Sequence, residues 1–158
     1  MNQIIEQAKK LYSLENCSFI PVSGHEGGRN QIVIVNRNED KEYVLRISAL
    51  GDRSENEFLG ETEFVRYLAE NGAPVTDVIP SVKGKLVECV EADGKSVYIS
   101  LFAYAKGMLL ADNGYSYREG APLSEYFYNT GKALGAIHRL SKTYTPVHPR
   151  PDYFDKTS

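Results

Sequence analysis

The sequence predicts an α+β fold in which a five-stranded antiparallel sheet carries one inserted helix and is followed by a linker and a further helix. The dipeptide Asp93-Gly94 separates two apolar, β-rich runs at 85–91 and 96–102. An Asp-Gly pair between two such runs is typical of a β-hairpin. A serine and a glutamate at 54–57 have the spacing of a capping box, which marks the start of a helix. Strands and a strongly signalled helix therefore share one short chain.

Three further strands are expected before that helix. Runs at 19–22 and 31–35 flank a glycine-rich stretch at 24–30, which is the arrangement of a hairpin with a long tip. The third strand covers 41–48. Because side chains alternate across a strand, its residues divide between two faces. Tyr43, Leu45 and Ile47 share one face, and Val44, Arg46 and Ser48 share the other.

The chain divides into three parts by its composition and its pattern of apolar residues. Residues 1–105 hold the predicted sheet and its inserted helix, and 106–121 form a linker rich in Asn, Gly, Ser and Tyr. Within 122–158, apolar residues at steps of three and four predict a helix over 122–143, followed by a tail with three prolines. The aromatic residues of this helix are interpreted as core positions, not as a ligand-binding cluster.

Composition excludes several classes of protein. Hydrophobic residues make up 42% and charged residues 25% of the 158, which are ordinary values for a globular protein. The net charge of -3 gives no broad basic field, so nucleic acid is not expected as a partner. The two cysteines, Cys17 and Cys89, have no metal-ligand spacing. With neither a signal peptide nor a long apolar run, we expect a cytoplasmic protein with no membrane partner.

Arg46 is the most telling single residue, since it lies inside a short apolar strand. A cation in that position needs an anionic neighbour to offset its desolvation. Glu61 on the predicted helix can provide one. The alternative is an edge-strand arginine that pairs with any of Glu57, Glu61 or Glu63, and on pattern alone it is about as probable.

Two backbone segments could contact a ligand without a side-chain signature. The glycines of 24–30 could offer several N–H groups to phosphate oxygens, although a plain hairpin turn explains them as well and is favoured when they are taken alone. The stretch 101–107, where the last strand ends, could recognise adenine through hydrogen bonds to its backbone groups. A strand end followed by a glycine turn accounts for it equally.

Taken in order, these motifs resemble the amino-terminal part of the aminoglycoside phosphotransferase and choline kinase-like superfamily, which is the small-molecule branch of the kinase fold. The resemblance covers nearly all of the chain. It implies that the sheet and inserted helix of 1–105 are a kinase-like ATP-binding N-terminal lobe and that 122–158 begin the C-terminal lobe. The residues that carry it are Gly27-Gly28-Arg29-Asn30, Tyr43-Val44-Leu45-Arg46-Ile47-Ser48, Glu61 with Tyr67-Leu68-Ala69-Glu70-Asn71-Gly72-Ala73-Pro74-Val75, and Leu134-Gly135-Ala136-Ile137-His138-Arg139-Leu140.

The resemblance also implies roles for particular residues toward ATP. By this likeness Arg46 contacts phosphates and Glu61 orients it, while Phe102 stands at the gatekeeper position. The complete enzyme would use Mg2+ with ATP. The implied ATP-binding set is Gly27 and Gly28 over the phosphates, Val44 above the adenine, Arg46, Glu61 and Phe102, with the Ala103 carbonyl and Ala105 N–H bonding the base.

The family's catalytic loop, His-Gly-Asp, is absent from these 158 residues. His138 is followed by Arg139, and His148 by Pro149. We therefore expect the ATP-binding portion of a kinase that phosphorylates a hydroxyl of a small molecule, with no turnover by this chain alone. The alternative is a non-catalytic binding or assembly module, in which the apolar stripe of the 122–143 helix lacks a covering lobe and pairs with a second copy.

Overall fold

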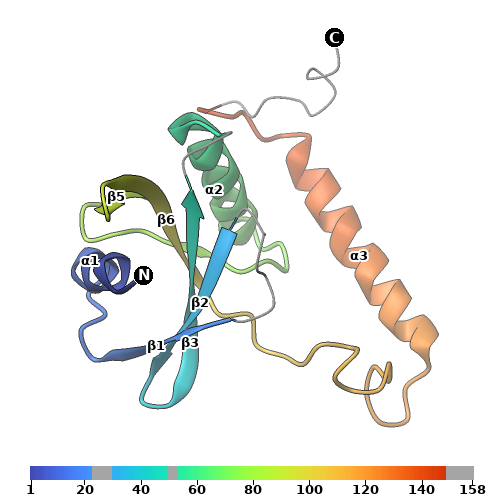
Figure 1. Ribbon diagram of the computed structural model, residues 1–158. Helices are drawn as coiled ribbons and strands as arrows, with labels where there is room; N and C mark the ends of the chain where they lie inside the picture. The colour runs from blue at the N-terminus through green and yellow to red at the C-terminus, as the bar shows by residue number, and fades with distance from the viewer. Residues whose placement is uncertain (23–29, 50–52, 149–158) are drawn as a thin grey trace.

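Six antiparallel strands form one sheet in the computed structural model, which describes residues 1–22, 30–49 and 53–148 (Figure 1). The main path of the sheet runs β1-β2-β3-β6-β4, and β5 pairs with the other half of the β6 edge. The strands are β1 Cys17–Pro21, β2 Asn30–Arg37, β3 Asp40–Ala49, β4 Val78–Ile79, β5 Glu88–Ala92 and β6 Lys95–Ala103. The helices are α1 Asn2–Tyr12, α2 Glu55–Glu70 and α3 Leu123–Ser141.

The sheet departs from the prediction at two places, the added sixth strand and the run predicted at 85–91, in which β5 begins only at Glu88. β4 contains only Val78 and Ile79, which pair with Phe102 and Leu101 of β6. The sequence predicts extended backbone here because Pro80 follows, and extended backbone is found. Its pairing with β6 depends on contacts between distant parts of the chain, so local sequence carries no signal for it.

Helix α2 begins where the capping-box spacing predicts. The Ser54 N–H donates to Oε2 of Glu57 at 2.7 Å, and the Ser54 hydroxyl accepts from the Glu57 N–H at 3.4 Å. These bonds satisfy donors that the first turn of a helix otherwise leaves unpaired. The helix ends before Gly72, whose φ of +76° is a left-handed conformation that glycine adopts at little cost. The start of α2 is therefore fixed by its own sequence.

The β5–β6 turn is the predicted tight hairpin. Asp93 and Gly94 both have positive φ, at 53° and 71°, as a type I′ turn requires. We expect Gly94→Ala to lower the free energy of unfolding by about 1 kcal/mol, because an L side chain is strained at this φ. Gly131→Ala on α3 is the matched control: its φ is not positive, nothing lies within 4 Å of the added Cβ, and alanine favours helix. Urea denaturation of both variants measures the contrast, and equal effects would contradict the turn assignment.

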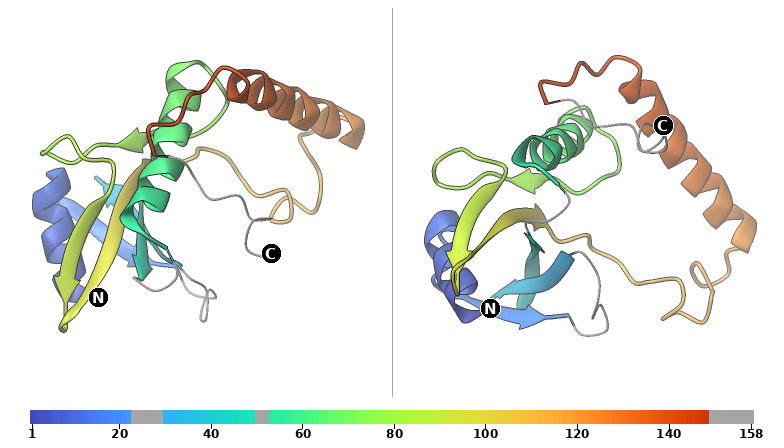
Figure 2. Two further views of the ribbon diagram at one scale, coloured as in Figure 1. Left: turned by 90° about the horizontal axis from the view of Figure 1, so that it is seen from above. Right: turned by 45° about the horizontal axis from the view of Figure 1, so that its top comes forward.

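The two faces of the sheet are covered by different helices (Figure 2). One face packs on α1, and its core centres on side chains such as Ala8, Val33 and Leu45, all 0% exposed. On the other face α2 packs Phe58 against Tyr98, with ring centroids 5.1 Å apart. The division follows the alternation of β3, because Leu45 points to the α1 side and Arg46 to the α2 side.

Helix α3 stands away from the sheet, beyond the long loop that follows β6 (Figure 1). It covers the predicted span to within two residues, but none of its residues is buried. Phe127 is 63% and Tyr128 71% exposed. The prediction that its aromatic residues are core positions is therefore wrong for the part of the chain that the structure describes. An amphipathic pattern indicates that a helix face needs a partner, but it does not say where that partner comes from.

The segment after α3 returns to α2 and crosses over it (Figures 1 and 2). The ring of Tyr144 lies 5.0 Å from that of Phe64 and 4.9 Å from that of Tyr67, centroid to centroid. Nδ1 of His148 lies 2.7 Å from Oε1 of Glu63. These contacts tie the C-terminal end of α3 to the outer side of α2. No helix within the described ranges has the length and apolar character needed to cross a bilayer.

Candidate functional site

Arg46 on β3 meets Glu61 on α2, as the sequence predicts. Nη1 of Arg46 donates to Oε1 of Glu61 at 2.6 Å, and the two side chains are 12% and 24% exposed. Of the other acidic candidates, Glu57 closes the capping box and Glu63 contacts His148. The structure therefore favours the helix carboxylate that the family resemblance implies over the alternative of a rim arginine pairing with any acidic neighbour.

Two aromatic rings pack against the guanidinium of Arg46, and two of its nitrogen atoms make no hydrogen bond with the described residues. Its Cζ lies 5.1 Å from the centroid of Phe102 and 5.9 Å from that of Phe58. Its Nε and Nη2 atoms are buried and have no hydrogen-bond partner among the described residues. A buried donor without a partner costs about 1–3 kcal/mol, so native structures rarely leave one unexplained. An anionic ligand that reached Nε and Nη2 would satisfy both donors.

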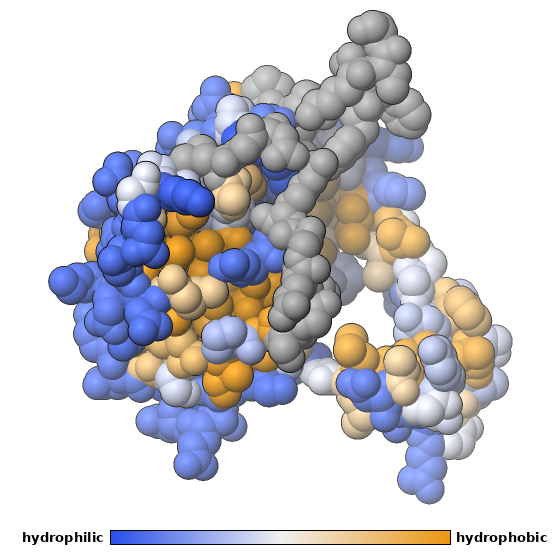
Figure 3. Space-filling view, viewed as in Figure 1, coloured by the Kyte–Doolittle hydropathy of each residue, from blue (hydrophilic) through white to orange (hydrophobic). Residues whose placement is uncertain are grey.

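An apolar row crosses the sheet on the same face as Arg46. In the strand register Ile20 pairs with Ile34, Ile34 with Val44, and Val44 with Phe102. Directly paired residues point to the same face, so these four side chains form one strip. Ile20 is 50% exposed and the other three are partly exposed. Figure 3 shows apolar side chains gathered over β1, β2 and β3 within a hydrophilic rim.

Backbone groups at the end of β6 lie beside this strip. The Ala103 N–H donates to the Asp77 carbonyl and the Tyr104 N–H to the Glu42 carbonyl, each at 2.9 Å. The N–H of Ala105, which is exposed, has no backbone acceptor in the parts of the chain that the structure covers. One donor next to an apolar strip suits a flat heterocycle that needs a hydrogen bond along its edge.

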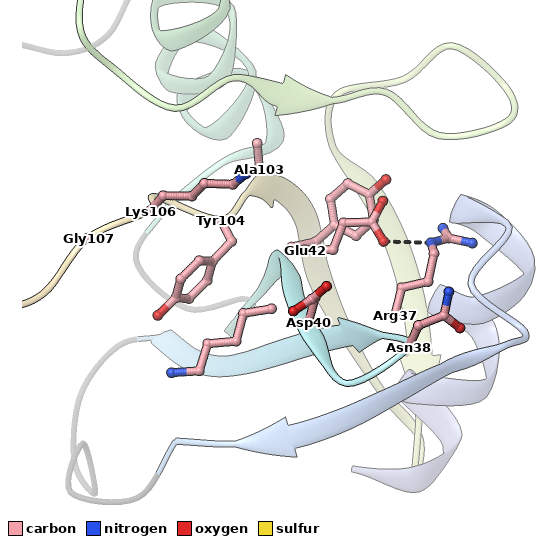
Figure 4. A pocket seen from close by; sticks show the side chains of 10 residues that line it. Arg37, Asn38, Asp40, Glu42, Ala103, Tyr104, Lys106 and Gly107 are labelled. Carbon is pink, nitrogen blue, oxygen red and sulfur yellow. Dashed lines mark hydrogen bonds and ion pairs between the residues drawn. The ribbon is translucent and has the colours of Figure 1, made fainter.

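A separate cavity of about 800 Å³ lies at the β2–β3 turn and the end of β6 (Figure 4). Charges of both signs line it, including the Arg37–Glu42 ion pair and Lys41, whose Nζ lies 5.4 Å from the Tyr104 ring centroid. The pKa of the Glu42 carboxyl is lowered, first by a hydrogen bond with the Tyr43 side chain and then by Arg37. Ala103 is its only predicted site residue, so this cavity is distinct from the Arg46 site.

No metal centre is formed by the residues that the structure describes. Within 1–22, 30–49 and 53–148, no group of three or more His, Cys, Asp and Glu side chains is placed to hold a metal ion.

The predicted site residues fall into three groups. Val44, Arg46, Glu61 and Phe102 come together on one face, and Ala103 and Ala105 follow at the end of β6. Gly27 and Gly28 lie outside the described residues. Sequence reasoning missed four contributors to the site: Ile20, Ile34, Arg53 and Phe58.

A signal for part of the missed set was present in the sequence. The four consecutive apolar residues at 32–35 do not alternate with polar ones. Such a run indicates a strand whose two faces are both covered, so the face carrying Ile34 could have been assigned to a ligand.

The family model described as the phosphotransferase enzyme family matches residues 22–156. The chain belongs to this family. The chain is also 30% identical over 112 residues to the amicoumacin kinase of Bacillus subtilis (strain 168), across 70% of this chain and 31% of that protein. Family membership confirms the resemblance that the motifs around Arg46, Glu61 and His138 suggest.

Two solved phosphotransferase structures share the fold. An amicoumacin kinase in complex with AMP-PNP and Ca2+ superposes with a TM-score of 0.77 at 21% identity, over 99% of this chain and 45% of that one. A microcompartment-associated aminopropanol kinase gives 0.72 at 19% identity, over 97% of this chain and 45% of that one. These likenesses confirm the predicted α+β kinase-like lobe. The chain spans less than half the length of each of these proteins.

Proposed function

We propose that this chain is the ATP-binding portion of a small-molecule kinase, which transfers the γ-phosphate of ATP to a substrate hydroxyl. The observation that carries the proposal is the pair of buried donors on Arg46, beside the apolar strip, that have no partner among the described residues. A nucleotide has both complementary parts, an anionic phosphate chain and a flat, largely apolar base. The solved amicoumacin kinase bound to AMP-PNP and Ca2+ supports nucleotide and divalent-metal chemistry for the family.

Each part of the site has a role in this proposal. Arg46 donates Nε and Nη2 to phosphate oxygens, and Glu61 orients the guanidinium through Nη1. Gly27 and Gly28 cover the phosphates with backbone N–H groups. The adenine lies against the strip of Ile20, Ile34, Val44 and Phe102, and it hydrogen bonds to the Ala103 carbonyl and the Ala105 N–H.

The reaction breaks the bond between the γ-phosphorus and the β–γ bridging oxygen and forms one to the substrate oxygen, releasing ADP and the proton of the hydroxyl group. Mg2+ supplies charge neutralisation at the phosphates when it is bound with ATP. The residues of this chain bind and orient the nucleotide, whereas no described side chain stands as a base for the hydroxyl proton. The need for ATP makes the cytoplasm the expected location, and a small-molecule alcohol is the expected acceptor.

Calorimetric titration of the 158-residue chain with ATP and Mg2+ tests the proposal. We expect a dissociation constant on the order of 0.1–1 mM, toward the weak end of the range in which enzymes bind their substrates. Adenosine should bind more weakly because it makes no contact with Arg46. Failure of ATP to bind at several millimolar, with the chain folded by circular dichroism, would contradict the proposal.

The exposed apolar residues of α3 favour a second candidate, an assembly module that keeps the shape of the lobe. Phe127 and Leu134 are 63% and 51% exposed, and a second copy could cover them. In that case light scattering gives a dimer, and the chain binds no nucleotide. A monomer that binds ATP would exclude the module.

A further inference from the structure

We propose that Arg53 is a positioning residue that keeps Arg46 open for an anionic ligand by holding the second oxygen of Glu61. The inference rests on the proposed nucleotide function and concerns the same site. Arg53 lies just before α2, outside the strand and helix motifs that predict the Arg46–Glu61 pair.

Within the described residues, two guanidinium groups contact the carboxylate of Glu61. Its Oε1 accepts from Nη1 of Arg46 at 2.6 Å, and its Oε2 accepts from Nη1 of Arg53 at 3.0 Å. Arg46 therefore contacts the carboxylate through one nitrogen only, and its Nε and Nη2 are left without a partner among the described residues.

An isolated arginine and carboxylate prefer a different arrangement. They frequently form a bidentate pair, with two parallel N–H···O bonds between the guanidinium group and the two carboxylate oxygens. If Oε2 of Glu61 were released from Arg53, it could turn to a second nitrogen of Arg46. The bidentate pair would then occupy a donor of Arg46 that the phosphate needs. By competing for Oε2, Arg53 keeps the contact between Arg46 and Glu61 to a single hydrogen bond.

The structure fixes Arg53 well enough for this role. Its side chain is 22% exposed, and its Cζ lies 5.2 Å from the centroid of Phe58, the ring that also faces Arg46. It immediately precedes Ser54, whose capping box anchors the start of α2. Packing on Phe58 and the adjacent cap limit the rotamers of Arg53, so little entropy is lost when it binds Glu61.

Nucleotide titrations of the 158-residue chain with substitutions at Arg53 test the inference. Arg53→Met removes the donors but keeps an apolar stem over Phe58, and we expect ATP to bind about tenfold more weakly while adenosine affinity is unchanged. Arg53→Lys retains a donor for Oε2 and should stay within about twofold of the original affinity. Arg118→Ala is the matched control. It removes an ion pair between the linker and Glu125 of α3, and it should change neither the ATP nor the adenosine affinity.

A purely structural role for Arg53 would lower ATP and adenosine affinities together, and that result would overturn the inference. So would an unchanged ATP affinity in Arg53→Met. In a Glu61→Gln background the same change at Arg53 should have no further effect on ATP affinity, since no carboxylate remains to be held.

If the unsubstituted chain binds no ATP, the proposed function fails and this inference fails with it. If only the effect of Arg53 is absent, the proposed function still stands. Should Arg53→Met not fold, Arg53→Ala provides a second donor-free variant.

Discussion

Arg46→Ala is expected to weaken ATP binding by about a hundredfold, the largest effect of any single change in the proposed site. Two charge-assisted hydrogen bonds to phosphate would be lost, each contributing about 1.5 kcal/mol or more, and tenfold in affinity corresponds to about 1.4 kcal/mol. Isothermal titration with ATP, with adenosine as the phosphate-free comparison, measures the loss. Adenosine affinity should stay the same, because the strip of Ile20, Ile34, Val44 and Phe102 remains.

The controls separate binding from folding. Arg118→Ala removes an arginine from an exposed ion pair with Glu125 and should leave ATP affinity unchanged. Arg46→Lys keeps the charge but offers no planar fork, so intermediate affinity is expected. An Arg46→Ala protein that folds and binds ATP as tightly as the original chain would remove the electrostatic basis of the proposed function.

Much of the fold could be predicted because its signals are local. Alternation along β3 places Leu45 and Arg46 on opposite faces, and both positions agree with the structure. The capping box at Ser54 and the Asp93-Gly94 turn depend on a few neighbouring residues and on φ angles that few residue types tolerate. Such features need no knowledge of the rest of the chain.

The features that escaped prediction depend on distant parts of the chain. The pairing of β4 with β6 joins residues more than twenty positions apart, and the apolar strip needs the register of four strands at once. Arg53 is the exception, since it lies only eight positions from Glu61, but it precedes α2 and the helical period does not relate the two residues. The exposed face of α3 has the pattern of a buried helix, since hydrophobic periodicity reports the need for a partner and not its presence.

The position of Arg46 beside the apolar strip fits ligand binding better than it fits stability. An arginine beside a partly exposed aliphatic and aromatic surface would be costly if it served stability alone, because its desolvation is only partly offset by one bond to Glu61. Stability would be served as well by an apolar residue at this position. A cation at the edge of an apolar strip, with two donors that no described residue accepts from, is instead the arrangement expected of a site that binds an amphipathic anion.

Leu45→Ala and Val44→Ala should separate the stabilising face of β3 from its binding face. Leu45 is 0% exposed in the α1-side core, so truncation should lower the free energy of unfolding by about 3 kcal/mol. Val44 is only partly buried, so its truncation should cost about 1 kcal/mol or less while weakening adenosine and ATP binding alike by several-fold. Urea unfolding and nucleotide titration of both variants provide the comparison. If Val44→Ala left both affinities unchanged, the base would have to bind elsewhere, because Val44 is the central residue of the strip between Ile34 and Phe102.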